Sequence, residues 1–181
     1  VQHVRIHTRM PCVQPQRITT QLANSIAKFA PVTIIVHFNH PREITAESKR
    51  ALAVLADAGI PLGNQSVLLK GVNDHVETMK ELCLQLLWNR VRPYYLHQAD
   101  LVHGTNHFRT RVEKGLEIIQ QLRGQISGLA IPQFVVDTPR GHGKVALLKP
   151  AIVASSVRSA TLRTWQGAEV EVPDPKPEPD I

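Results

Sequence analysis

Short apolar runs alternate with amphipathic stretches along most of this chain, and this alternation restricts the fold more than any other feature. Val32–Phe38 is a nearly continuous β-branched run, which is typical of a strand buried on both faces. Thr45–Ala58 has a capping threonine, inward-facing leucines at helical spacing and a closing glycine, Gly59. Repeats of this kind predict a parallel sheet covered by helices.

About four such repeats occur. Strands are predicted at Val4–His7, Val32–Phe38, Ser66–Leu69, Arg92–His97 and Gln133–Asp137. Helices are predicted after Thr19, with Leu22, Ile26 and Phe29 at helical spacing, at Thr45–Ala58, at Val76–Trp88, and from a Thr110-x-x-Glu113 capping box through Leu122. A closed eight-stranded barrel needs about 250 residues. The predicted fold is therefore α/β, a partial (β/α) barrel, and we expect its N-terminal strands to lie outside this chain.

The composition changes near Pro150. We expect residues 1–150 to form the barrel portion and residues 151–181 to form a C-terminal extension. Within the extension, Leu162–Val172 has the pattern of a hairpin, and Pro173–Pro179 predicts an extended, disordered tail.

Charge and composition restrict the partners. Lys and Arg number 21 against 15 acids, a net charge of +6, but no basic block is longer than two residues. A nucleic-acid-binding module is thus a disfavoured alternative, because basic stripes with interleaved aromatics are absent. No run approaches the roughly 18 apolar residues of a membrane helix. Two cysteines and no signal sequence favour the reducing cytoplasm.

Polar residues gather where the predicted strands end, which is where sites lie in such folds. His37 and His40 follow one strand, Gly63-Asn64-Gln65 precedes the next, and His97, Asp100 and Asp137 end two others; Lys144 closes the glycine-containing loop from Arg140. On an extended chain, side chains three residues apart point to opposite faces, which argues against His37 and His40 as a metal pair. By position alone, the aspartates are better explained as backbone caps and Lys144 as a surface lysine.

Several strings change this assessment. HFNHPREIT, DAGIPLGNQSVLLKGVND, RPYYLHQADL, HFRT and FVVDTPRGHGK follow one another in order between about Val4 and Pro150. They resemble successive landmarks of the lysine 2,3-aminomutase family. That family is a radical S-adenosylmethionine (SAM), pyridoxal phosphate (PLP) group built on a partial β/α barrel.

The resemblance implies a role for five residues. Lys144 matches the lysine that forms a Schiff base with PLP, Asp100 and Asp137 match the carboxylates that hold the distal ammonium of substrate lysine, and His37 and Gln65 match SAM contacts. In the family, an external electron donor feeds a [4Fe–4S] cluster that cleaves SAM to a radical. The amino group of lysine then moves from C2 to C3. Two carboxylates favour a cationic substrate over glutamate.

The chain also departs from the family pattern. It has no CxxxCxxC motif, so the cluster ligands are expected outside this chain, which should be inactive alone and hold no metal. It also lacks the C-terminal cysteines that hold a structural zinc in well-known members. His97 stands where an aromatic residue is common, and the loop reads RGHG. A branch that modifies elongation factor P, a truncated non-catalytic remnant, and a homo-oligomer stay open.

Overall fold

The structure is a computed structural model that describes residues 2–29, 31–138, 142–156 and 158–173. It divides into two compact units, Val1–Leu147 and Leu148–Ile181, which are described separately below. None of the helices within the described residues is both long enough and apolar enough to cross a membrane.

The first unit contains a six-stranded sheet in the order β1-β2-β3-β4-β5-β6. The first five strands are parallel, and β6 runs antiparallel to β5. The strands are β1 (Val4–Thr8), β2 (Val32–Val36), β3 (Leu62–Leu68), β4 (Val91–Gln98), β5 (Gln133–Asp137) and β6 (Lys144–Ala146). The predicted succession of parallel strands and helices is confirmed.

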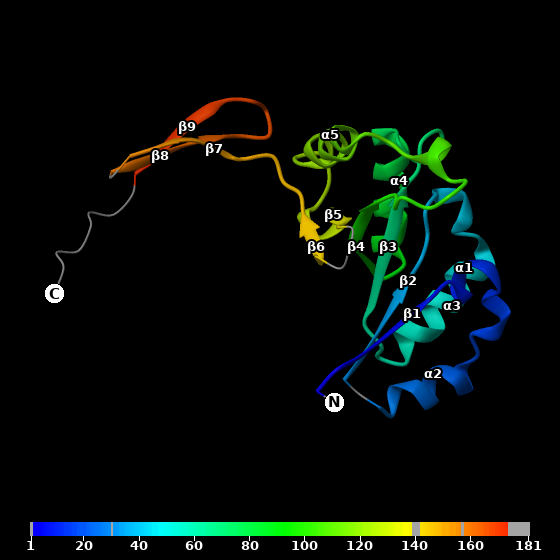
Figure 1. Cartoon of the computed structure of the whole chain (residues 1–181). Coiled ribbons are helices and arrows are strands. Elements are labelled where there is room, and N and C mark those ends of the chain that lie inside the picture. Colours follow the sequence, from blue (N-terminus) through cyan, green and yellow to red (C-terminus); the bar gives the residue numbers. More distant parts are fainter. Residues whose placement is uncertain (1, 30, 139–141, 157, 174–181) are drawn as a thin grey trace. The chain divides into compact units, whose positions relative to one another are not determined.

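Helices connect the parallel strands and lie against one face of the sheet (Figure 1). The α-helices are α1 (Met10–Val13), α2 (Thr20–Ala27), α3 (Ala46–Asp57), α4 (Val76–Trp88) and α5 (Val112–Leu122); short 3-10 turns are η1 (Pro15–Arg17), η2 (Pro41–Glu43), η3 (Asn106–Phe108) and η4 (Gly128–Ala130). The side chains of Thr19 and Thr45 cap α2 and α3 as predicted, and Gly59 has φ +77° after α3.

The core of this unit lies between the helices and the sheet. Alternate residues of each strand point into it, as shown by Ile34, Val36 and Phe38, all at most 2% exposed. Helix α5 packs closely on β5, because a Cβ atom at Gly115 would lie 2.2 Å from the ring of Phe134. The intervening residues point to the other face of the sheet, which we call the open face.

Two local predictions are wrong. Gly63-Asn64-Gln65 does not precede a strand but lies inside β3, because its residues pack tightly: a Cβ atom at Gly63 would lie 2.9 Å from Ile35. The capping box at Thr110 is not formed. Helix α5 has Arg111, one residue later, as its N-cap and no side-chain cap, and the Thr110 hydroxyl has no hydrogen-bond partner among the described residues.

The apolar face predicted for the first helix also differs in part. Helix α2 ends at Ala27, its buried residue is Ala23, and Phe29 lies beyond the helix with 74% of its surface exposed. The helix thus ends two residues before the last position of the predicted apolar face.

The second unit contains an antiparallel sheet of three strands, β7 (Ile152–Ser155), β8 (Ser159–Arg163) and β9 (Glu169–Pro173). Strands β8 and β9 form the hairpin that the sequence predicts, with Leu162 opposite Val170. The predicted Pro-rich tail lies outside the described residues after Pro173.

Candidate functional site

The open face of the sheet carries three of the polar side chains that the sequence singles out. His37, Gln65 and His97 each lie between two buried neighbours whose side chains enter the core or the polar contacts beside it. Because successive side chains of an extended chain point to opposite faces, all three point away from the helices. Gln65 and His97 lie in the neighbouring parallel strands β3 and β4, and His37 directly follows the adjacent strand β2.

A β-bulge adds two aromatic rings to this face. The register between β3 and β4 shifts between Asn64 and Gln65, so that Gln65 pairs with Tyr95 and Tyr94 is an extra residue. The two tyrosine rings then stack with centroids 3.8 Å apart. Beside Tyr94, toward the amino ends of the strands, lies a largely apolar hollow of about 230 Å³ that also contacts Arg5 and Ile35.

Asp137, Lys144 and His97 form a charged cluster at the carboxyl end of the parallel strands. The ammonium Nζ of Lys144 donates to Oδ1 and Oδ2 of Asp137 at 2.5 and 2.7 Å. Nδ1 of His97 lies 3.0 Å from Oδ2 of the same carboxylate. These residues come from β5, β6 and β4, and register places Asp137 directly opposite Lys144.

The electrostatics of this cluster follow from these contacts. The hydrogen bond from Lys144 lowers the pKa of Asp137, and His97 adds to the effect. Burial and the charge of Lys144 lower the pKa of His97, although Asp137 opposes the change. His97 is therefore neutral at pH 7. Since an ionised carboxylate only accepts hydrogen bonds, its proton lies on Nδ1.

His97 leaves one acceptor unused. Its Nε2 atom is buried and has no hydrogen-bond partner among the described residues, and Tyr95 meets the imidazole edge to face at 5.6 Å. The Nζ atom of Lys144 lies 5.5 Å from the centre of the Tyr95 ring, within range of a cation–π contact. The cluster thus combines an amine, a carboxylate, an imidazole and an aromatic face.

Asp100 does not join this cluster. It follows β4 in an exposed loop, and no hydrogen bond or ion pair of its side chain is found among the described residues. Its negative charge is nevertheless close enough to favour protonation of His97. The loop itself is held by Arg109, whose Nε donates to the carbonyl of Ala99 at 3.2 Å.

His37 and His40 are separated, as their spacing predicts. His37 meets His7 of β1 edge to face at 6.4 Å, and burial together with the charge of Arg9 lowers its pKa. His40 instead accepts a hydrogen bond from the backbone of Arg42 through Nδ1 and caps η2.

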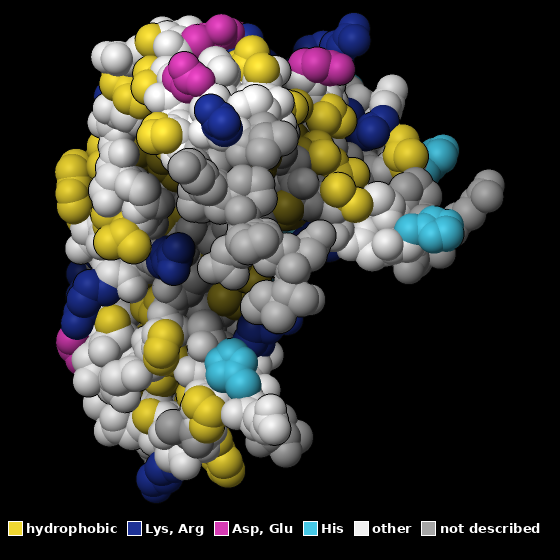
Figure 2. Space-filling view, turned by 90° about the vertical axis from the view of Figure 1, so that its left-hand side faces the viewer, with side chains coloured by type: hydrophobic (Ala, Val, Ile, Leu, Met, Phe, Trp, Pro, Cys, Tyr) yellow, Lys and Arg dark blue, Asp and Glu magenta, His cyan; other side chains and the backbone are white. Residues whose placement is uncertain are grey.

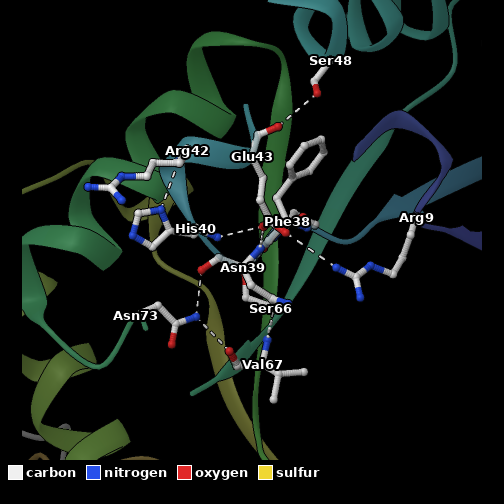
Figure 3. Close-up of polar contacts among 11 residues, drawn as sticks. Arg9, Phe38, Asn39, His40, Arg42, Glu43, Ser48, Ser66, Val67 and Asn73 are labelled. Atoms are coloured by element: carbon white, nitrogen blue, oxygen red, sulfur yellow. Dashed lines mark hydrogen bonds and ion pairs between the residues drawn. The ribbon is translucent and has the colours of Figure 1, made fainter. Parts of the chain in front are cut away.

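The turn after β2 is fixed by a buried amide network that the sequence analysis missed (Figure 3). The Asn64 side chain, 1% exposed, accepts from the N–H of Phe38 at 2.8 Å and donates to its carbonyl at 3.1 Å. Ser66 donates to the same carbonyl at 2.7 Å. This network fixes the backbone that immediately follows His37.

A second part of the network joins the turn to the segment after β3. Asn39 accepts from the N–H of Val67, and Asn73, fully buried, donates to the carbonyls of both residues at 2.8 Å. Glu43 accepts from the N–H groups of Asn39 and His40. Buried asparagines in and beside apolar strands were the available signal, because a buried amide needs partners.

The two cysteines lie apart from this face. Burial raises the pKa of Cys12 to about 11, with help from Glu43, and raises that of Cys83 to about 12. Cys83 is 1% exposed and belongs to the core, as predicted. Among the described residues no group of three or more His, Cys, Asp or Glu is arranged to hold a metal ion.

Basic side chains show no continuous stripe on the face drawn in Figure 2, where Lys and Arg lie singly or in small groups. This distribution differs from the clustered basic surface that typically follows a nucleic acid backbone.

Comparison with known proteins shows which family the chain resembles. Residues 119–180 match the family described as lysine-2,3-aminomutase. An L-lysine 2,3-aminomutase from Clostridium subterminale is 53% identical over 97% of this chain, and one from Fusobacterium nucleatum is 49% identical over 97%. Over 97% of its length the chain is thus similar to L-lysine 2,3-aminomutases. The resemblance carried by the strings from HFNHPREIT to FVVDTPRGHGK is thereby confirmed.

Two further findings qualify this similarity. The chain spans about two-fifths of the length of these relatives, 41% and 42%. A glutamate 2,3-aminomutase from Clostridioides difficile is 48% identical over the whole chain and 43% of its own length, so sequence similarity alone does not fix the substrate. The fold resembles a radical SAM methyltransferase from Sphaerobacter thermophilus, with a TM-score of 0.50 and 21% identity over 68% of this chain and 39% of that one.

Proposed function

We propose that this chain supplies the substrate- and PLP-binding part of a lysine 2,3-aminomutase, an isomerase that moves the 2-amino group of L-lysine to C3. The observation that carries the proposal is the amine of Lys144 at the carboxyl edge of the parallel sheet, next to Asp137 and facing Tyr95. An amine, a carboxylate and an aromatic face meet here, in a chain that is similar to lysine 2,3-aminomutases.

The residues present fit PLP. The Lys144 side chain is 32% exposed, so its amine is accessible to an aldehyde, and Gly143 precedes it with φ +91°, a conformation that favours glycine. PLP, when bound, supplies a conjugated ring that delocalises an unpaired electron next to the migrating nitrogen. The chain's own part is to hold that ring through Lys144 and to place acids and bases around it.

His37 and Gln65 are the proposed SAM contacts. Both point to the open face from adjacent strands, and the lowered pKa of His37 keeps its imidazole neutral at pH 7. A neutral donor and acceptor suits a sulfonium cation, because a protonated histidine would repel it. The ligands of the [4Fe–4S] cluster, the remaining barrel strands and the contact with an electron donor are proposed to lie outside this chain.

Asp100 and Asp137 are the proposed contacts of the substrate's distal ammonium. Asp137 ends β5 and Asp100 lies in the loop after β4, and the charges of both reach His97. A glutamate side chain would place a third carboxylate there, which like-charge repulsion disfavours. We therefore propose lysine rather than glutamate as the substrate, in a protein of the cytoplasm.

The test is the visible absorbance of PLP bound to the full-length protein that contains this chain. Lys144→Ala should remove the band of lysine-linked PLP. Lys28→Ala, which changes an exposed lysine at the end of α2, should leave it unchanged. A Lys144→Ala protein that keeps the band would remove Lys144 from its proposed role.

Conversion of L-lysine to β-lysine under anaerobic conditions is the second readout. Turnover of glutamate in place of lysine would assign the other substrate of the family. If the wild-type protein shows no PLP band and converts neither amino acid, a non-catalytic remnant is favoured.

A further inference from the structure

Asp137 already holds an ammonium group that belongs to this chain. Lys144 donates to both carboxylate oxygens, at 2.5 and 2.7 Å, and His97 reaches Oδ2 at 3.0 Å. A substrate ammonium that uses the same carboxylate must meet the Lys144 ammonium there. Two ammonium groups that share the carboxylate of Asp137 lie in contact and repel each other, even with Asp100 nearby.

We propose that Lys144 is an internal competitor of the cationic substrate for Asp137, so that Asp137 exchanges one ammonium for another while His97 keeps the carboxylate in place. The proposal rests on the function proposed above. No covalent bond forms or breaks in the exchange, since only a hydrogen-bonded ion pair is replaced by a second one of the same kind.

The two partners of Asp137 differ in how easily they leave. Lys144 is the first residue of β6, a strand of three exposed residues at the sheet edge, and it follows Gly143. Its ammonium sits on a long unbranched chain with four rotatable bonds. The ion pair is partly open to water, with side-chain exposures of 32% for Lys144 and 43% for Asp137, so it contributes little stability and is easily replaced.

His97 cannot leave in the same way. It lies inside β4, which pairs with β3 on one side and β5 on the other, and its side chain is 14% exposed. The short imidazole is also confined by the ring of Tyr95. Its hydrogen bond therefore fixes Asp137 Oδ2 whichever ammonium group is bound. His97 is a positioning residue here.

The exchange has a consequence for the order of events. As long as Lys144 is an unreacted amine, it occupies Asp137 and weakens binding of a second cation. If Lys144 holds PLP through this nitrogen, as proposed, Asp137 is available when L-lysine first binds. The site would thus bind the distal ammonium of lysine well only in protein that already carries PLP.

The experiment uses the full-length protein stripped of PLP, with L-lysine as the titrated ligand and calorimetry as the readout. Replacing Lys144 by Gln removes the competing charge but keeps a polar chain, and should tighten L-lysine binding about fivefold. Lys144→Arg keeps the charge and should give no gain. Lys28→Gln is the matched surface control and should behave like the wild type.

A second ligand tests whether the distal ammonium of L-lysine causes the tighter binding. L-norleucine, which lacks the distal ammonium, should therefore bind equally to the wild type and to Lys144→Gln. His97→Phe should weaken L-lysine binding in the Lys144→Gln background, because Asp137 then loses its fixed hydrogen bond. Gln at position 97 should restore part of it, since an amide again donates.

Unchanged or weaker L-lysine binding by Lys144→Gln would overturn the proposal, as would an equal gain for L-norleucine or for Lys144→Arg. The PLP band of the wild-type protein separates the two ideas. If that band is present and Lys144→Gln binds L-lysine no better, only the competition is wrong. If wild-type protein forms no such band, the function proposed for Lys144 fails as well.

Discussion

The two ends of one sheet edge are held by different kinds of bond. At β2 and β3, neutral amide and hydroxyl groups of Asn64, Ser66 and Asn73 are at most 5% exposed and bond to the backbone. At β5 and β6, charged side chains bond to one another, and the pair of Asp137 and Lys144 is about a third or more exposed.

The difference teaches which parts of the site can change partners. A buried amide that loses its partner leaves unpaired polar groups, each costing about 1–3 kcal/mol, so the turn after His37 has one arrangement. A partly exposed ion pair contributes about 0–1 kcal/mol, because water and salt replace it readily. The end that faces SAM in our proposal is thus rigid. At the end that faces PLP and the substrate, the charged side chains can exchange partners.

The largest loss of stability is expected from a substitution in the rigid end, at β2 and β3. Asn64→Ala leaves the N–H and carbonyl of Phe38 without the Asn64 amide in a buried site, and should lower the local stability by about 3 kcal/mol. Amide hydrogen exchange of Phe38 in the full-length protein measures this, with an acceleration of about 100-fold expected.

Asn24→Ala is the matched control for that change, because Asn24 is exposed on α2. It should leave exchange at Phe38 unaltered. An Asn64→Ala protein with protection equal to that of Asn24→Ala would show that the amide network does not hold the turn, and the contrast between the two ends would disappear.

Much of the fold could be predicted from the sequence, since it depends on local periodicity. The capped helix from Ala46 to Asp57 and the helix from Val76 to Trp88 have their predicted positions, because threonine caps and apolar stripes are encoded within a few residues. Strand β3 was placed too late. Gly63 and Asn64 are poor strand formers, and only their tertiary contacts with Ile35 and Phe38 explain them.

The candidate site was predictable as a list of residues but not as an arrangement. The pairing of Asp137 with Lys144 depends on β6 folding back antiparallel on β5, and a three-residue strand has no periodicity to reveal it. The stacking of Tyr94 on Tyr95 requires a bulge whose position no local pattern gives. Asp100 lies where the sequence placed it, yet it does not contact the other charged residues.

A smaller effect is expected from pH, and it distinguishes the two ends. His37 and His97 have pKa values below the usual 6.5 in the folded protein, so the unfolded chain binds more protons below that value. Stability should be constant above about pH 6.5 and fall as the pH decreases below it. Melting temperatures between pH 5 and 8 measure this, in the full-length protein without added ligand.

His97→Gln should reduce the slope of that pH dependence, because one of the two partly buried imidazoles is gone. His3→Gln is the control, since His3 is exposed and lies outside both ends of the site. An unchanged slope in His97→Gln would mean that the pKa of His97 is not lowered in the folded protein, against the effect of its burial and of Lys144.

The smallest expected effect concerns the exchangeable end. Lys144→Gln removes the ion pair with Asp137, but the pair is partly exposed, and its loss should change the free energy of unfolding by no more than about 1 kcal/mol. Hydrogen exchange of the Thr138 amide, which bonds to the carbonyl of Gly143, reports this locally. A loss as large as that of Asn64→Ala would make Lys144 a structural anchor of β6. A lysine fixed in that way could not give up Asp137 to a substrate, so the small effect is a condition for the exchange to work.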